Sequence, residues 1–275
     1  MRLFSFICVA EVLAVFSCFA AARADNDISP RVIGGQIATF GYDDDATLET
    51  PTARRVFDFG FDPAVDSNST TDPGIHALST DFAATFGTST NHIVASGFPN
   101  GSKIAFDVVS DLKLWNGASF GPVPNGETLQ LSFGPASITV GTGAGFYHGF
   151  TVGTVGGAFG DQGFHEHLTS TTVAGAGHAN PVDGIYAFQM QLRLLSADNV
   201  MPYPGIAPSL PFYVLYDHDS LNPNDPIDAA IDYAQSVVPE PSACLLGVFG
   251  GVLLIIVGLR GTCQRLATSP RQEEV

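Results

Sequence analysis

Cysteine is absent from the central part of this 275-residue chain. The four cysteines are Cys8, Cys18, Cys244 and Cys263, so residues 25–238 contain none. This excludes a disulfide-stapled scaffold and a cysteine nucleophile for that region. Its length still allows a hydrophobic core large enough to stabilise it without cross-links.

Positive charge is also scarce. The chain has 11 Lys and Arg against 27 Asp and Glu, and residues 25–238 alone have six against 23, a net charge of −17. Because nucleic-acid affinity depends on Lys and Arg that neutralise phosphates, the acidity argues against DNA or RNA as a partner. Charged residues are only 14% and hydrophobic residues 45% of the chain, which excludes charge-driven disorder.

Strong helix formers are few, whereas Gly (30) and Pro (18) are abundant, and this balance argues against a helical bundle. The sequence also contains no G-x-S-x-G motif for a nucleophilic serine. We therefore expect a mainly β protein that is not an enzyme.

The first 24 residues have the organisation of a secretory signal peptide. Arg2 supplies the positive charge, residues 3–20 are mostly apolar, and Ala22 and Ala24 form a small-x-small cleavage site. Lipidation at Cys18 is the alternative, but the residues before it fit a lipidation motif poorly. The sequence thus predicts export of the chain.

A second apolar run, residues 243–259, lies near the other end. It has 17 residues without a charge, the lower limit for a membrane-spanning helix. Arg260 and Arg265 follow it, and positive residues remain on the cytoplasmic side. The run predicts a membrane anchor with residues 266–275 as a cytoplasmic tail, and a buried core helix is the alternative.

The short segment Val238-Pro239-Glu240-Pro241 stands directly before this run. Together with the apolar run and Arg260, it resembles the PEP-CTERM sorting signal of exported bacterial proteins, over residues 238–265. The resemblance implies processing by an exosortase-type membrane enzyme, in bacteria that make extracellular polysaccharide. The two prolines independently keep the segment extended, as a processing enzyme requires.

Period-2 alternation of apolar residues dominates residues 25–237, and Gly, Pro, Asn and Asp clusters separate the alternating segments. Such short strands with turns between them predict an antiparallel β-sandwich or jelly roll. The expected strands are residues 56–61, 104–109, 127–133, 138–140, 164–168, 186–194 and 212–216. One short helix is expected up to Val237, capped by Asp225 with Pro226 at its first position. Residues 63–75 and 197–210 are expected to be long loops.

His165 and His167 form the sharpest local pattern. In a strand their imidazoles point to the same side, which is a common start of a transition-metal site. His148, His178 and Glu166 are candidates for a third ligand, with His148 preferred. The pattern resembles the first half of a cupin metal motif, but the glutamate expected after the second histidine is missing. The favoured interpretation is an exposed or hydrogen-bonded pair without metal.

Asp217, Asp219, Asp225 and Asp228 match positions 1, 3, 9 and 12 of a calcium loop. Helix capping already explains Asp225 and Asp228, so Asp217 and Asp219 are the remaining calcium candidates. A solvating acidic surface is the default explanation.

Trp115, the only tryptophan, is either a sugar-stacking platform or a packed side chain, and packing is favoured.

Taken together, these patterns predict an exported, membrane-tethered protein of the cell surface or extracellular matrix. We expect a structural or interaction role without catalysis and without a required cofactor. The expected partners are an exosortase-type enzyme, the membrane and extracellular polysaccharide. Two alternatives stay open: a metal-binding jelly-roll enzyme that uses His165 and His167, and a calcium-dependent carbohydrate-binding module.

Overall fold

The computed structural model describes residues 26–43, 48–50, 52–61, 67–77, 96–143, 145–156, 164–218 and 226–238. The predicted leader, the apolar run at 243–259 and the tail lie outside these residues, as does the sorting segment after Val238. Within the described ranges, no helix is long and apolar enough to cross a membrane.

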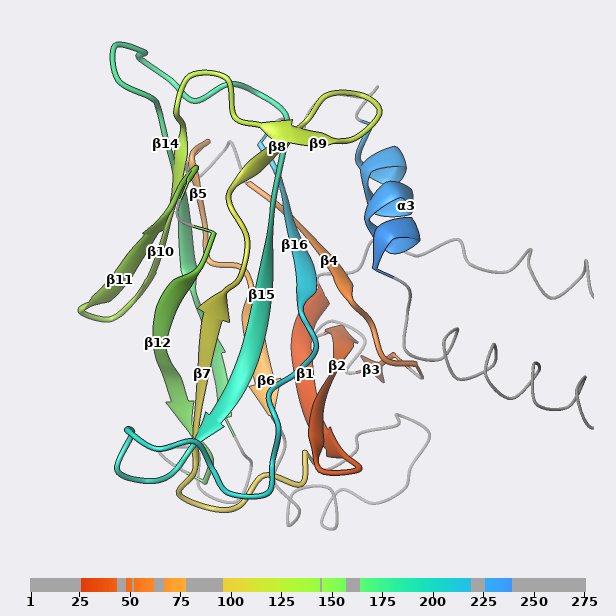
Figure 1. Ribbon diagram of the computed structural model, residues 1–275, viewed down its shortest axis with the longest axis vertical. Coiled ribbons are helices and arrows are strands. Elements are labelled where there is room, and N and C mark those ends of the chain that lie inside the picture. The colour runs from red at the N-terminus through yellow and green to blue at the C-terminus, as the bar shows by residue number, and fades with distance from the viewer. Residues whose placement is uncertain are drawn as a thin grey trace, which may run out of the picture.

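The largest sheet forms one layer of the molecule (Figure 1). Its central strands follow the order β12–β7–β15–β16–β4, and two short strands, β8 and β9, extend it beside β15. The strand bounds are Tyr147–Thr154 (β12), Lys103–Val108 (β7), Ile185–Leu195 (β15), Phe212–Asp217 (β16), Val56–Gly60 (β4), Lys113–Trp115 (β8) and Phe120–Pro122 (β9).

Two smaller sheets share the other side of the core. The five-stranded sheet has the order β13–β6–β1–β2–β3, and the four-stranded sheet has the order β11–β10–β14–β5. Their strands are Phe164–His167 (β13), Gly74–Ala77 (β6), Asn26–Ile33 (β1), Gln36–Asp43 (β2), Leu48–Glu49 (β3), Ala136–Val140 (β11), Thr128–Phe133 (β10), Thr169–Val173 (β14) and Ser69–Thr70 (β5).

The two smaller sheets are joined by the chain itself. β13 passes into β14 through the single residue Leu168, which is buried and whose amide donates to the Pro73 carbonyl at 3.0 Å. β5 and β6 also follow one another in the sequence, and they pair with β14 and β13, respectively. The five- and four-stranded sheets therefore act as one bent layer facing the large sheet.

The main core lies between these layers. Along β15, Tyr186, Phe188, Met190, Leu192 and Leu194 point into it, as the period of two requires. The core side chains opposite come from both smaller sheets, among them Ile28, Ile75, Leu129 and Leu131.

The outer face of the large sheet has its own, smaller cluster. Ile185, Ala187 and Leu215 point outward there and are covered by α3 (Ile227–Val237). Figure 1 shows α3 outside β4 and β16. The helix packs through small and β-branched side chains, namely Ile227, Ala230, Ile231 and Ala234.

The expectation of a mainly β fold with one short helix is confirmed for the described residues. The expected strands around β4, β7, β10, β11, β13, β15 and β16 are present. The helix begins after Pro226, which is the N-cap residue and makes no side-chain cap bond, whereas we expected Pro226 inside the helix. Asp225, the expected cap, lies outside the described residues.

Two expectations are corrected. The pairing is not wholly antiparallel, because β1 pairs with β6 and β16 with β4 in parallel. Long stretches of chain separate the members of each pair, and such connections allow a crossover where a tight hairpin does not. The predicted loop 63–75 also contains β5 and the start of β6, which gain their ladder partners from distant strands.

Candidate functional site

Strand β6 lies between β13 and β1, and the register of these three strands builds the site. His165 pairs with His76, His167 pairs with Gly74, and Ile28 pairs with Ile75. Because Ile28 and Ile75 belong to the core, their neighbours in sequence point away from it. The histidines therefore lie on the outer face of the five-stranded sheet.

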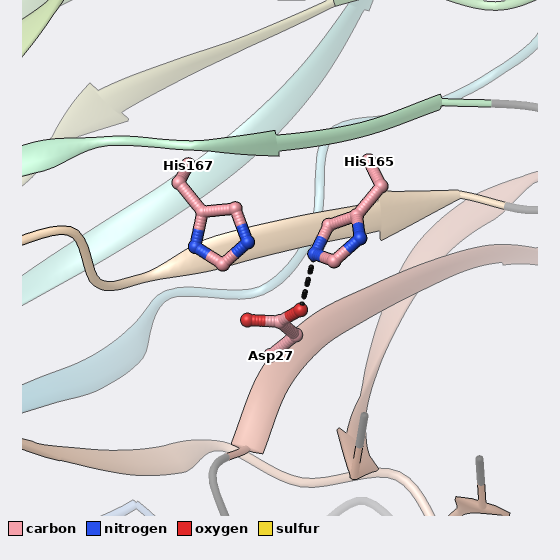
Figure 2. A group of neighbouring side chains, drawn as sticks. All are labelled: Asp27, His165 and His167. Carbon is pink, nitrogen blue, oxygen red and sulfur yellow. Dashed lines mark ion pairs between the residues drawn. The ribbon is translucent and has the colours of Figure 1, made fainter. Parts of the chain in front are cut away.

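Asp27 of β1 reaches across β6 to this histidine pair (Figure 2). Its Oδ2 lies 2.6 Å from Nε2 of His165, a short ion-pair distance. The Asp27 side chain is almost fully buried, at 4% exposure, whereas that of His165 is 32% exposed. A buried carboxylate requires a partner of this kind, since an isolated charge there would be strongly destabilised.

Gly74 makes this reach possible. Strands in a sheet are about 4.8 Å apart, so a side chain on β1 meets β6 before it meets β13. A Cβ built at position 74 would overlap the Asp27 carboxylate. The absence of a side chain at Gly74 thus creates the space in which Asp27 lies.

His167 is oriented by the backbone. Its Nδ1 lies 3.1 Å from the Thr71 carbonyl and 3.9 Å from Oδ1 of Asp72. A carbonyl oxygen only accepts, so Nδ1 carries the proton and the neutral ring keeps a lone pair on Nε2. Figure 2 shows one ring nitrogen of His167 on the side that faces His165 and Asp27.

His76 completes the row of rings on this face. Its ring centroid is 4.1 Å from that of Tyr42 and 5.0 Å from that of His165. Burial, followed by the nearby His165, lowers the pKa of His76 from 6.5 to about 4, although Asp27 opposes this shift. His76 is therefore neutral at pH 7.

Asp27, His165 and His167 each offer one ligand atom, and these three atoms lie within 4.8 Å of one another. Two imidazole nitrogens and a carboxylate oxygen form a donor set suited to zinc and related divalent ions. Without a metal, the same residues form a buried ion pair with an oriented second histidine.

His148 does not lie in this group. It stands on β12, with its side chain 80% exposed and Nδ1 3.4 Å from Oδ1 of Asp107. Asp107 is in turn paired with Arg193, at 3.1 Å. The expected third ligand is thus replaced by Asp27.

The calcium candidates are not brought together in the described residues. Asp217 is buried at the end of β16, and Asp228 is exposed in the first turn of α3. Asp219 and Asp225 lie outside the described residues, as do Ala22, Ala24, Pro239, Glu240, Pro241 and Arg260 of the leader and sorting segments. Val238 is described and is the buried C-cap residue of α3.

Trp115 is half-buried rather than displayed as a flat platform. Its ring centroid is 5.1 Å from that of Phe120 and 5.5 Å from that of Tyr233 on α3. This agrees with the packing interpretation of the only tryptophan.

Sequence reasoning missed Asp27 and Gly74. No local pattern marks Asp27, because its role depends on a parallel pairing with a strand that is distant in sequence. The His-x-His spacing found the other two members of the group.

Comparison of the chain with known protein families, with curated proteins and with solved structures finds no match.

Proposed function

We propose that this chain is an exported protein of the bacterial cell surface or extracellular matrix, held at the membrane until an exosortase-type enzyme processes its C-terminal signal. In this proposal residues 25–237 form an extracytoplasmic β-sandwich with a structural or binding role and no catalytic one. Residues 243–259 form the membrane helix, and extracellular polysaccharide is the expected partner.

The observation that carries the proposal is the position of the end of helix α3 next to the sorting segment. Helix α3 ends at Val237, and Val238 is packed into the outer cluster of the large sheet. Pro239-Glu240-Pro241 follows directly in the sequence. Cleavage at this segment would therefore keep every described strand and core residue in the released body.

The composition of the body supports the same route. Its core spans both layers and contains no cysteine, so its stability does not depend on the redox state of the compartment. The strongly acidic surface favours solubility and disfavours nucleic acid as a ligand.

Export is tested by producing the full chain in a Gram-negative host and determining the N-terminus of the membrane-associated product. We expect the mature chain to begin at Asp25. Ala24→Phe is expected to block this cleavage, whereas Arg23→Gln, at the tolerant middle position, is the matched control. Full-length protein in the cytoplasm with its leader intact would overturn the proposal.

Sorting is tested in the same host with and without a co-expressed exosortase. We expect a shorter, membrane-released product only when the enzyme is present. Glu240→Ala should abolish this product, and Glu274→Ala, which changes an acid outside the segment, should not. Equal processing of both variants would contradict the role of the Pro-Glu-Pro segment.

A further inference from the structure

We propose that Asp27, His165 and His167 bind one divalent transition-metal ion of the zinc class on the outer face of the five-stranded sheet. The proposal is independent of the export route, and it assigns a ligand to a surface that the proposed function leaves unused.

The first argument is the position of the donor atoms. Ligands at 2.0–2.2 Å from a tetrahedral zinc ion are separated from one another by about 3.3–3.6 Å. The three donor atoms already lie within 4.8 Å of one another. The Asp27–His165 contact of 2.6 Å would open by somewhat under 1 Å as the ion enters between the two atoms.

The second argument is the orientation of His167. Metal-binding histidines usually donate their other ring N–H to a carbonyl or carboxylate, which fixes the tautomer and the ring. The Nδ1 contact of His167 with the Thr71 carbonyl provides this bond before any ion arrives. A plain ion pair between Asp27 and His165 would not need His167 to be oriented.

The third argument is the space at Gly74. This residue lies opposite His167 in the β6–β13 ladder, and its missing side chain is replaced by the Asp27 carboxylate. The carboxylate is thereby brought from the third strand of the sheet to the histidines on the first. An ion pair with His165, which lies on the edge strand β13, would not by itself require the partner carboxylate to be buried as deeply as that of Asp27.

The site would keep an open coordination position. Three protein ligands leave room for water or an exogenous donor on zinc, as in sites that bind or activate a ligand. His165 and His167 are 32% and 40% exposed, so their solvent side is accessible. A carboxylate or hydroxyl group of a partner molecule is the chemistry that such a position accepts.

The test is a titration of the full chain with Co²⁺, a spectroscopic substitute for Zn²⁺. The protein is purified in detergent, treated with EDTA and dialysed, and its cysteine thiols are blocked with N-ethylmaleimide so that they cannot bind the ion. We expect visible d–d absorption that saturates at one equivalent of Co²⁺ and disappears when Zn²⁺ is added. Absence of saturable binding by the wild type would overturn the proposal.

Variants assign the binding to this site. His167→Ala and Asp27→Asn are each expected to weaken Co²⁺ binding at least about tenfold, and His148→Ala, on β12, is the matched control. Gly74→Ala should also weaken it, because a Cβ there displaces Asp27. Unchanged binding in His167→Ala, or an equal loss in His148→Ala, would refute the assignment.

A second measurement separates lost binding from lost folding. Zn²⁺ should raise the thermal unfolding midpoint of the wild type and of His148→Ala, but not that of His167→Ala. His167 is the safest ligand to remove, because its side chain is 40% exposed. An equal rise in midpoint for His167→Ala would place the ion elsewhere and contradict the proposal.

Discussion

The side-chain oxygens of Ser170 and Tyr216 lie 2.6 Å apart in the interior and connect the two layers of the sandwich. Ser170 belongs to β14 and Tyr216 to β16 of the large sheet. Both hydroxyls also reach the Asp72 carbonyl, at 2.6 Å from Ser170 and 3.2 Å from Tyr216. Burial raises the pKa of Tyr216, so its hydroxyl stays protonated and available as a donor.

Removal of either hydroxyl should destabilise the fold, because the remaining hydroxyl and the Asp72 carbonyl would each lose a hydrogen-bonding partner in the interior. We expect Tyr216→Phe and Ser170→Ala each to lower the free energy of unfolding by about 1 kcal/mol. Urea unfolding of the two single variants and the double variant measures their coupling. If the two losses simply add, the hydroxyls do not interact in the way described.

Stability should fall on mild acidification because of His76. Above pH 6.5, the pKa of His76 in the unfolded chain, the residue is neutral in both states, so its titration does not lower the free energy of unfolding. Between pH 6.5 and about 4 the unfolded chain takes up a proton that the folded chain does not. The free energy of unfolding should therefore fall with falling pH, by at most about 1.4 kcal/mol per pH unit for this group.

This pH dependence is measured by urea unfolding between pH 7.5 and 4.5 in metal-free buffer. His76→Gln should flatten the slope, and His178→Gln, which changes an exposed histidine, should leave it as in the wild type. A slope that is the same for the wild type and His76→Gln would show that His76 is not its source.

Gly149 on β12 should not tolerate a side chain. A Cβ at this position would overlap the Phe106 carbonyl and approach the Phe106 ring on neighbouring β7. We expect Gly149→Ala to lower stability by about 1–3 kcal/mol through displacement of the strand. Gly121→Ala is the matched control, because a Cβ there meets only Asn116 Nδ2 at an ordinary 3.8 Å. Equal thermal midpoints for the two variants would contradict this packing.

The fluorescence of Trp115 should report whether α3 is in place. The indole ring contacts Tyr233 of the helix, and it is the only tryptophan in the chain. Tyr233→Ala should expose the indole and shift its emission to longer wavelength, whereas Asp232→Ala, on the exposed side of α3, should not. An unchanged spectrum in Tyr233→Ala would mean that the Tyr233 ring does not shield Trp115, and would contradict this contact.

The parts of the fold with a local signature could be predicted from the sequence. β15 alternates from Phe188 to Leu194, and the His165-x-His167 spacing identifies a strand whose two imidazoles share a face. Both inferences depend only on the two-residue period of a strand.

β1 and β2 have no such signature. Pro30 in the middle of β1 removes a ladder donor and argues against a strand, yet the structure accommodates it opposite Thr39. The turn between the strands, Gly34-Gly35 with positive φ at both residues, is the signal that could have revealed the hairpin.

The candidate site was only half predictable for a related reason. His165 and His167 are neighbours in sequence, but Asp27 joins them through the order of three strands across the sheet. Spacing along the chain carries no information about that order. The sequence does not mark Gly74 either, because this glycine matters only through the Asp27 carboxylate that β1 places over it.

Helix α3 is the last described element before the C-terminal segment, and it lies on the outside of the large sheet. A pulling force applied to the chain beyond Val238 would reach this helix before it reached any strand. Eleven helical residues span about 16 Å and, once extended, more than 35 Å. If the helix alone peels away and extends, the connection lengthens by about 20 Å while the paired strands of the sandwich stay in place.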